Sequence, residues 1–536
     1  MKNIKKLLAL LLAVVMVVSV LAACNNDKPV ETKPNETKGQ DSGNKETQPK
    51  ETEPAEPVKL TFMFNGGEIV EGSIGWHWVK QLEEHCNVEI EWICPASSAY
   101  TDQLQLTLLE ENRPDAIIFP TDWMDSASFA DAVNAGMFTD IAGMIENYPN
   151  LMEHTASVSW EALDIFDDGR IWGVPRSTVM RADGWWVNEQ WLEAIGSDYK
   201  EGDIITIDEL YDIIYKFTYN DPDGNGVNDT YGVRSYAKDD GTVYTGFEHI
   251  FGLGTGSEFY MIDGEPVMLK YSKEHDNYKK YLAFMQKCWE AGVIDPDAFA
   301  LDNKASNERW LANVTGIWCQ YAGNMQVVPT DQNPATYVYL PGVVEKEGDT
   351  FGYGEFATGV YYYWSISNTC EHPEKVLEVF DYVLSDEQWT NLNAGSVEGI
   401  GFDILPDGNY DFSKTDALKA EGKGMENINP IKLIMRRATG AEFFINKKLP
   451  IAQQERLADL IDYAFEYYVA PVDEGYVPAV ATDPVFIEYE AYMAQEVAKI
   501  ITGEEPVDHW DEVLDGWYKA GGQAYIDEVL AYINSK

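Results

Sequence analysis

Apolar and polar residues alternate along the chain in blocks that predict strands and helices in turn. The stretches Lys59 to Phe64 and Val88 to Ile93 are rich in β-forming residues and predict two strands. Helices are expected from Trp76 to His85 and from Thr101 to Glu111, and a third strand from Asp115 to Phe119. Strands that alternate with helices of about ten residues predict βαβ units and a parallel sheet.

The ends of the predicted strands are the first candidates for a ligand-binding site. In open parallel sheets, ligands bind beyond the carboxyl ends of the strands. Here those ends fall at Asn65 to Glu68 and at Pro120 to Trp123. Asn65, Asp122 and Trp123 are therefore expected near a ligand.

A different pattern marks the N-terminus. Lys2, Lys5 and Lys6 precede an apolar run from Leu7 to Leu21, which is too short to span a bilayer comfortably and has the length of a signal-peptide core. The following Leu21-Ala22-Ala23-Cys24 resembles a bacterial lipobox, which implies cleavage before Cys24 and attachment of a diacylglyceryl group to its sulfur. The alternative is an ordinary signal peptide cut at Ala-x-Ala, with Cys24 incidental.

The segment after Cys24 is predicted to be a tether. From Asn25 to Pro57 it has no aromatic residue, and Val30 is its only sizeable aliphatic one. Such a stretch cannot bury enough apolar surface to offset its ordering entropy, so we expect it to be disordered and extended. The predicted organisation is a signal peptide over residues 1–23, a lipidated cysteine with its tether over 24–57, and a folded body after it.

Charge and cysteine content exclude several classes of function. The net charge of −51 over 536 residues argues against nucleic acid and anionic lipid as partners, since phosphate binding needs Lys and Arg. Five scattered cysteines remain beside Cys24, which is neither a disulfide framework nor a zinc pattern. A Cys86–Cys94 pair is one possibility, and small buried apolar residues are the favoured interpretation.

Several segments form recognisable landmarks along most of the body. They are Tyr100 to Phe119, Ile171 to Ser177, Gly184 to Leu192, Phe356 to Ser367 with the helix after Pro373, and Ser396 to Ile400. Taken in order, they resemble the family of extracellular solute-binding proteins, including oligosaccharide- and alginate-binding lipoproteins. The usual Ser-Gly-Asp of that family before Pro114 is replaced here by Glu111-Asn112-Arg113.

The resemblance implies an α/β fold of the type II periplasmic-binding-protein kind. Two α/β lobes are joined by crossover segments, and the ligand cleft lies between them. The first lobe is expected to comprise residues 58–178 plus 320–365, and the second residues 179–319 plus 366–536. Asn188 is a good N-cap for the helix that follows the first crossover, and Gly196 a good helix stop.

Aromatic residues make up 13% of the chain, and several lie near predicted strand ends or crossovers. Sugar rings pack their C–H faces on aromatic rings, while their hydroxyls need polar partners. Core packing is the alternative for each, and it is favoured for Trp185, Trp186 and Trp191; Arg436-Arg437, a rare basic pair, is a weaker candidate. The predicted ligand-binding residues are Asn65, Asp122, Trp123, Arg176, Trp318, Tyr321, Tyr363 and Trp364.

The sharpest local motif is the loop from Asp221 to Asp229. Its oxygen donors at positions 1, 3 and 5, glycine at 6, carbonyl at 7 and carboxylate at 9 match the front of an EF-hand loop. Gly232 replaces the bidentate glutamate, so the loop is not an EF-hand. It resembles the calcium loop of alginate-binding proteins, with Thr230 where they have Glu, and the alternative is a turn without metal. The predicted ligands of a structural Ca²⁺ are Asp221, Asp223, Asn225, Val227 and Asp229.

No sequence motif indicates an enzyme. HExxH, GxSxG and Walker patterns are absent, and Gly252 to Gly256 lacks the context of a dinucleotide fingerprint. The leading hypothesis is a monomeric, lipid-anchored receptor on the outer face of a bacterial cell membrane. It would bind a carbohydrate, most simply an oligosaccharide, and deliver it to the permease of an ABC importer. The alternatives are a lipid-anchored polysaccharide-degrading enzyme with paired carboxylates and an adhesion or scaffold lipoprotein.

Overall fold

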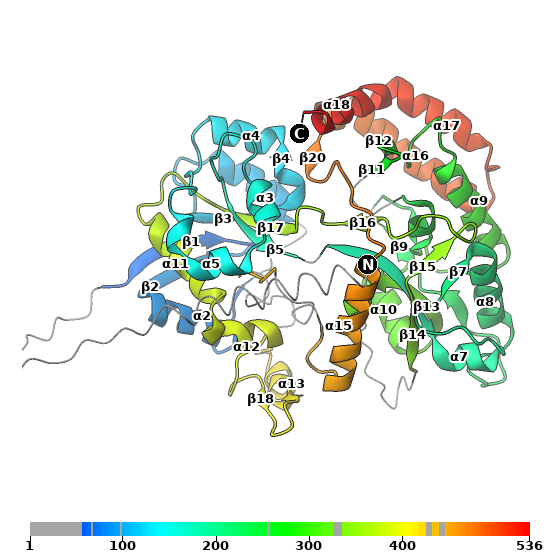
Figure 1. Cartoon of the computed structure of the whole chain (residues 1–536), viewed down its shortest axis with the longest axis horizontal. Coiled ribbons are helices and arrows are strands. Elements are labelled where there is room, and N and C mark those ends of the chain that lie inside the picture. The colour runs from blue at the N-terminus through cyan, green and yellow to red at the C-terminus, as the bar shows by residue number, and fades with distance from the viewer. Residues whose placement is uncertain are drawn as a thin grey trace, which may run out of the picture. The chain divides into compact units, whose positions relative to one another are not determined.

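The structure is a computed structural model of the whole chain (Figure 1). The signal sequence, Cys24 and most of the predicted tether lie outside the residues that it describes. The described residues are 56–65, 68–96, 99–178, 180–238, 240–253, 258–324, 335–424, 431, 434–438 and 445–535.

The first sheet confirms the predicted βαβ pattern. Its strand order is β2-β1-β3-β17-β5, and β1 pairs in parallel with both β2 and β3. The late strand β17 enters between β3 and β5 and runs antiparallel to both. Its first residues therefore lie at the carboxyl edge of β3, where a ligand is expected. The strands are β1 (Val58–Met63), β2 (Val88–Ile93), β3 (Ala116–Pro120), β5 (Val174–Ser177) and β17 (Val360–Ile366).

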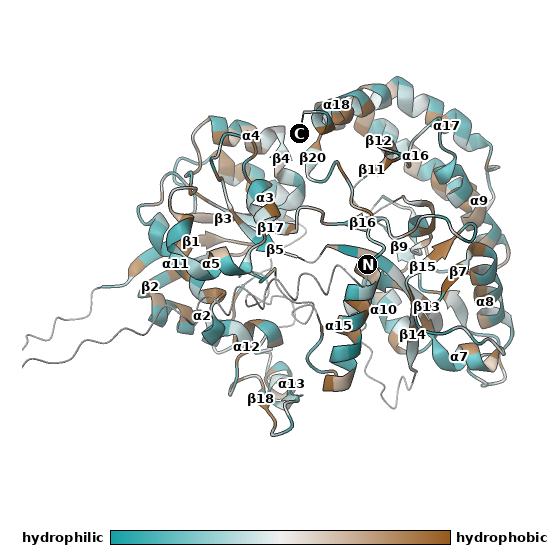
Figure 2. Ribbon diagram, viewed as in Figure 1, coloured by the Kyte–Doolittle hydropathy of each residue, from teal (hydrophilic) through white to brown (hydrophobic). Residues whose placement is uncertain are grey.

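Helices that share one apolar core with this sheet have recognisable ends. In α2 the Ser73 hydroxyl accepts the backbone N–H of Trp76 at 3.1 Å, and the left-handed Asn87 ends the helix. Figure 2 shows hydrophilic and hydrophobic residues together on such helices, as expected when one stripe faces a core. The helices are α2 (Ile74–Cys86), α3 (Tyr100–Leu108), α4 (Ala127–Asn134), α5 (Pro149–His154), α6 (Ser157–Glu161), α11 (Pro373–Val383) and α12 (Asp386–Ala394), with the short turns η2 (Thr121–Trp123) and η3 (Ile145–Asn147).

The second sheet has the order β14-β6-β13-β8, with β16 also paired to β6. Its central strand β6 follows β5 of the first sheet almost directly, and Asn188 at its end caps α7 through the N–H of Trp191, as predicted. The strands are β6 (Arg181–Asn188), β8 (Tyr231–Val233), β13 (Thr315–Tyr321), β14 (Tyr337–Leu340) and β16 (Gly354–Glu355).

A second apolar core joins this sheet to helices from distant parts of the sequence. A capping box forms at α8, where Thr206 and Glu209 exchange hydrogen bonds. The C-terminal helix α16 packs against α9 and α17 (Figure 1). The helices are α7 (Glu189–Ala194), α8 (Ile207–Tyr219), α9 (Asn277–Glu290), α16 (Pro484–Thr502), α17 (His509–Trp517) and α18 (Gln523–Ile533), with η4 (Phe247–Phe251), η7 (Ala479–Thr482) and η8 (Tyr518–Gly522).

Two further helices, α10 and α15, cover a smaller apolar cluster around Trp186, Trp310 and Trp318. Short strands complete the description, and one of them, β20, pairs in parallel with β4. The remaining elements are α10 (Asn303–Leu311), α13 (Ser413–Ala420), α15 (Ile451–Phe465), η5 (Ala322–Asn324), β4 (Asp125–Ser126), β7 (Ile204–Thr206), β9 (Tyr236–Ala237), β10 (Val243–Tyr244), β11 (Phe259–Ile262), β12 (Glu265–Met268), β15 (Gly342–Val344), β18 (Asp403–Ile404), β19 (Tyr410–Asp411) and β20 (Tyr476–Val477).

The packing corrects two of the boundaries predicted for the lobes. Residues 320–365 were assigned to the first lobe, yet β14 within them is a strand of the second sheet. Residues 366–536 were assigned to the second lobe, yet α11 and α12 share the core of the first sheet. The reason is that β17 re-enters the first sheet, and the helices that follow it cover the apolar surface nearest to that strand.

Three smaller findings bear on the sequence predictions. Cys86 and Cys94 are free, and burial raises the pKa of the Cys86 thiol to about 12, as expected of an inert buried residue. Trp185, Trp186 and Trp191 lie in the core, as favoured. Among the described helices, none combines the length and apolar composition that crossing a bilayer requires.

The buried Trp191 gives a test of the second core. Its ring packs edge-on against Phe217 at 5.2 Å between centroids, and it fills the space above Gly316. Replacing it with alanine leaves a large cavity, so Trp191→Ala should lower the free energy of unfolding by about 3–5 kcal/mol. Chemical denaturation measures this loss. The exposed Leu109→Ala is the control and should change stability by less than about 0.5 kcal/mol.

Candidate ligand-binding site

Three connecting segments lie against one another. Residues 177–178 and 180–181 run from β5 to β6, residues 355–360 run from β16 to β17, and residues 469–477 lead from α15 into β20. The backbone N–H of Thr178 in the first donates to Gly359 in the second at 2.9 Å. Glu474 in the third accepts the N–H of Thr358 at 2.9 Å. The segments therefore bring the edges of β5, β6 and β17 together.

Arginine and tyrosine side chains gather at these edges. The Arg176 guanidinium lies 5.5 Å and 5.6 Å from the ring centroids of Tyr361 and Tyr362, and that of Arg436 lies 5.9 Å from Tyr361. Such distances are typical of cation–π contacts. Together with Arg181 and Tyr321, these residues form what we call the arginine–tyrosine cluster: Arg176, Arg181, Arg436, Tyr321, Tyr361 and Tyr362.

Arg181 holds the side of the cluster that belongs to the second sheet. Its guanidinium lies 5.1 Å from the Tyr321 ring, 3.4 Å from Asp183 Oδ1 and 3.1 Å from Glu355 Oε2. Burial lowers the pKa of Arg181, but the two carboxylates outweigh it and keep the pKa above its usual value. Burial in turn raises the pKa of Glu355.

The other two arginines have a different electrostatic environment. Burial, followed by repulsion from Arg436, lowers the pKa of Arg176, and burial lowers that of Arg436. Two buried guanidinium groups that repel one another are stabilised by oxygen-rich groups placed between or beside them. The cluster thus provides hydrogen-bond donors next to aromatic rings.

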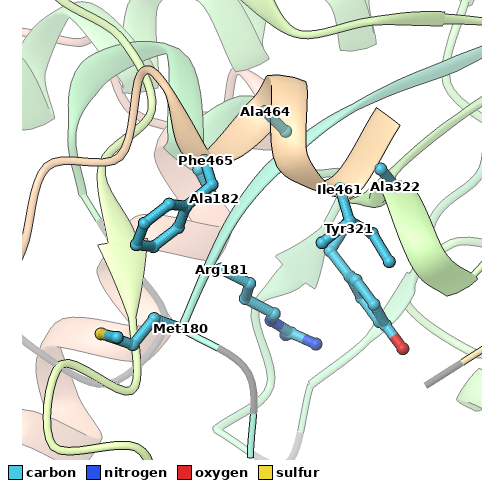
Figure 3. Close-up of a pocket in the computed structure, with 8 residues that line it drawn as sticks. All are labelled: Met180, Arg181, Ala182, Tyr321, Ala322, Ile461, Ala464 and Phe465. Carbon is cyan, nitrogen blue, oxygen red and sulfur yellow. The ribbon is translucent and has the colours of Figure 1, made fainter. Parts of the chain in front are cut away.

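Figure 3 shows the edge of the cluster beneath the last turn of α15. Arg181 and Tyr321 extend to the same side, while Ile461, Ala464 and Phe465 of α15 line the opposite wall of a small pocket with Met180. The helix therefore buries the start of β6 and fixes the direction in which Arg181 extends.

Four of the predicted ligand-binding residues lie in or beside this site. Arg176 and Tyr321 are members of the cluster, and the Asn65 amide donates to the hydroxyl of Tyr362 at 3.2 Å. Asp122 lies on η2 at the end of β3, where partial desolvation raises the pKa of its carboxyl.

The four other predicted residues are packed in apolar cores instead. Tyr363 stacks on Phe119 at 5.4 Å and, like Trp364, is completely buried. The Trp364 indole donates to the carbonyl of Ile434 at 2.7 Å. Trp123 and Trp318 are also largely buried. These positions favour a packing role, because a buried indole has no face left for a ligand.

Sequence reasoning missed Tyr361, Tyr362 and Arg181, and gave Arg436 little weight. A positional signal was available for the tyrosines. An antiparallel strand beside β3 places its first residues, not its middle, at the ligand edge of the sheet, and Tyr361 and Tyr362 are the second and third residues of β17.

The loop after α8 clusters oxygen atoms as predicted. The Asn225 amide donates to Asp223 at 2.8 Å and to Asp229 at 3.0 Å, and the N–H of Gly226 donates to Asp221 Oδ2 at 2.9 Å. Burial, with the neighbouring Asp221 and Asp229, raises the pKa of Asp223. The other oxygen of Asp221 is buried and has no hydrogen-bond partner among the residues that the structure describes.

This donor set fits a hard cation such as Ca²⁺, because it offers three carboxylates, an amide oxygen and the Val227 carbonyl. In the described residues, however, no group of three or more His, Cys, Asp or Glu side chains is arranged to hold a metal. The Asn225 side-chain N–H₂ group now faces Asp223 and Asp229. Rotating the amide would place its oxygen there instead, so that the groups facing a cation would all be oxygen atoms.

The family of bacterial extracellular solute-binding proteins matches residues 77–388, which is more than half of the chain. The chain belongs to this family. The matched range includes every strand of the two sheets except β1, and five of the six residues of the arginine–tyrosine cluster. This match confirms the prediction from the sequence that the protein is a solute-binding protein rather than an enzyme.

Individual relatives agree with this assignment. The lipoprotein LipO of Bacillus subtilis strain 168 is 22% identical over 470 residues, which cover 84% of this chain and 87% of LipO. An HMO-binding, ABC-transporter-associated solute-binding protein of Bifidobacterium longum infantis has a TM-score of 0.64 at 18% identity, covering 89% of this chain and 99% of its own. An EF-hand mutant of FusA, an ABC-transporter substrate-binding protein of Streptococcus pneumoniae, in complex with fructo-nystose, has a TM-score of 0.58 at 18% identity, covering 89% and 99%. These likenesses confirm the predicted fold class.

The third connecting segment of this solute-binding protein contains two buried acids. Asp473 accepts the backbone N–H groups of Glu258 and Phe259 at 2.9 and 3.2 Å. Burial nevertheless raises the pKa of Asp473 and of Glu474 to about 7. Desolvation therefore outweighs the hydrogen bonds, and the segment titrates near neutral pH.

This titration predicts how stability depends on pH. A carboxyl whose pKa is higher in the folded state than in the unfolded state binds its proton more tightly when folded, so its contribution favours folding as the pH falls from about 7 towards 5. For Asp473 the effect should be on the order of 1–3 kcal/mol. Thermal melts from pH 5 to 8 should show a flatter profile for Asp473→Asn than for the wild type, and an unchanged profile would contradict this origin. The exposed Asp240→Asn serves as the control.

Proposed function

We propose that this protein is a receptor that binds a carbohydrate against the arginine–tyrosine cluster. The observation that carries the proposal is the placement of aromatic rings beside buried guanidinium groups, where the segments connecting the two sheets meet. A sugar ring offers C–H faces to Tyr361 and Tyr362 and oxygen acceptors to Arg176 and Arg436. The names of the structural relatives, one HMO-binding and one in complex with fructo-nystose, support the same class of ligand.

Tyr361 offers the cleanest test, since it is 38% exposed and contributes little to the core. Loss of a ring that packs on a sugar should cost on the order of 1–3 kcal/mol, so Tyr361→Ala should bind at least about tenfold more weakly. The measurement is calorimetric titration with the best ligand from a thermal-shift screen of plant and host oligosaccharides, with fructo-nystose included.

The matched control is Tyr215→Ala, because Tyr215 is 44% exposed on α8 and is not part of the cluster. It should bind as the wild type does. The contrary result is full affinity in Tyr361→Ala together with lost affinity, at unchanged stability, in Trp123→Ala or Trp364→Ala. The ligand would then contact the tryptophans predicted from the sequence and not the arginine–tyrosine cluster.

The membrane anchor and the transport partner are further parts of the proposal. The lipobox at Cys24 would hold the protein on the outer face of the cell membrane, and a permease of an ABC importer would receive the bound sugar. LipO is named a lipoprotein, which supports the anchor. In cells, Cys24→Ser should release a folded protein into the medium, whereas retention of that variant in the membrane fraction would contradict lipidation.

The loop from Asp221 to Asp229 would bind one structural Ca²⁺ through Asp221, Asp223, Asn225, the carbonyl of Val227 and Asp229. The ion would neutralise the repulsion between the three carboxylates and tie the end of α8 to β8. The EF-hand named for the FusA relative supports this assignment. The missing glutamate predicts an affinity weaker than that of a complete EF-hand.

Calcium removal should therefore lower the melting temperature by several degrees, because an ion that binds only the folded state stabilises it. Asp223→Ala should abolish the difference between melts with Ca²⁺ and with chelator. Asp212→Ala, which removes a carboxylate from the exposed face of α8, should leave the difference intact. Equal calcium dependence in wild type and Asp223→Ala would show that the loop is only a turn.

A further inference from the structure

A second cavity lies within the part of the molecule built around the second sheet. Its volume is about 510 Å³, and its walls come from the β9–β10 hairpin, η4, the end of β12, α9 and α16. Five tyrosines line it: Tyr236, Tyr244, Tyr271, Tyr278 and Tyr281. We call it the tyrosine pocket. It shares no lining residue with the arginine–tyrosine cluster.

The floor of the pocket holds a carboxylate with unused hydrogen-bonding capacity. Glu248 is only 7% exposed. Its Oε1 accepts the hydroxyl of Tyr281 at 3.3 Å and lies 3.7 Å from the Lys238 ammonium. Its Oε2 is buried and has no hydrogen-bond partner in the described residues. A buried acceptor left unsatisfied costs about 1–3 kcal/mol, which a donor on a ligand would recover.

The charges around the pocket restrict the ligand. Three carboxylates and two lysines line it, so the wall has one negative charge in excess. Lys270 is already bound to Glu258 at 2.8 Å, and Lys238 lies 3.8 Å from Asp240 as well as near Glu248. An anionic ligand would meet an excess of carboxylates and no uncommitted cation. Hydroxyl donors, in contrast, meet acceptors.

The aromatic walls restrict it further. Tyr271, Tyr278 and Tyr281 form a continuous series with centroid distances of 5.4 and 5.5 Å, and Tyr236 lies 5.0 Å from Tyr244 at the hairpin. Rings of this kind pack against the C–H faces of a sugar while their hydroxyls reach its oxygens. Small-molecule pockets typically measure about 300–1,000 Å³, which leaves room here for one or two sugar rings.

We propose that the tyrosine pocket is a second carbohydrate site, which binds one or two uncharged pyranose units through its tyrosines and through a hydroxyl that donates to the Glu248 carboxylate. This site is additional to the one at the arginine–tyrosine cluster and lies within elements of one core. It therefore binds its ligand whether or not the site at the arginine–tyrosine cluster is occupied. The two sites also differ in the charge they tolerate.

Calorimetric titration at millimolar sugar tests the proposal on the whole mature chain. The probes are glucose, galactose, mannose, their methyl glycosides, maltose, cellobiose and lactose, with galacturonate as the anionic comparison. At least one neutral sugar should bind to wild type and to Tyr361→Ala alike. Glu248→Gln should weaken that binding at least tenfold, and galacturonate should not compete for it.

Two further variants separate a ligand site from a structural cavity. Lys238→Trp places an indole across the mouth of the pocket from a half-exposed position and should abolish binding without disturbing the core. Glu265→Gln, an exposed carboxylate on β12 that does not line the pocket, should have no effect. The proposal is overturned if no neutral sugar binds to Tyr361→Ala, or if Glu248→Gln and Lys238→Trp both bind as the wild type does. If instead the proposed carbohydrate site at the arginine–tyrosine cluster is wrong, Tyr361→Ala should bind every oligosaccharide as the wild type does.

Discussion

The burial of Arg181 beside two carboxylates is the constraint on which the site depends. Its guanidinium can leave water only because Asp183 and Glu355 accompany it. Asp183 lies on the same strand, whereas Glu355 belongs to the segment that returns to the first sheet. The ion pairs therefore fix where that segment leaves the second sheet, and with it where β17 begins. The positions of Tyr361 and Tyr362 follow from that starting point.

The arginine–tyrosine cluster brings three arginines together in one region of an acidic protein. With 90 acidic residues against 39 lysines and arginines, a guanidinium at the surface finds a carboxylate easily. Arg176 and Arg436 also lie beside tyrosine rings, and burial lowers their pKa values. A position that costs stability in the empty protein is useful where an oxygen-rich ligand compensates for it. The tyrosine pocket has the opposite balance of charge, so the two proposed sites would suit different sugars.

Sequence patterns predicted the first βαβ units well because each of those elements satisfies its own local rules. The helix caps at Ser73, Asn188 and Thr206 are hydrogen bonds between residues close in sequence. In Val88 to Ile93, apolar and polar residues alternate, so the sequence itself indicates which face of the strand is buried. The tyrosine-rich strand β17 gave no such signal. Four consecutive aromatic residues, Tyr361 to Trp364, carry no period of two, so only the neighbours of the strand decide which rings are buried. The lobe boundaries failed for the same reason, since the re-entry of β17 is a long-range pairing.

That re-entry also determines when the protein can fold. β17 occupies a place between β3 and β5, although it lies more than 180 residues further along the chain than either. The first sheet cannot close until this late strand has been synthesised, and pairings of such long range form slowly. A chain that emerges from the ribosome N-terminus first thus presents an incomplete sheet for most of its synthesis. With the export signal predicted from the sequence, delayed closure would keep the polypeptide threadable through a narrow translocation channel until it reached the outside.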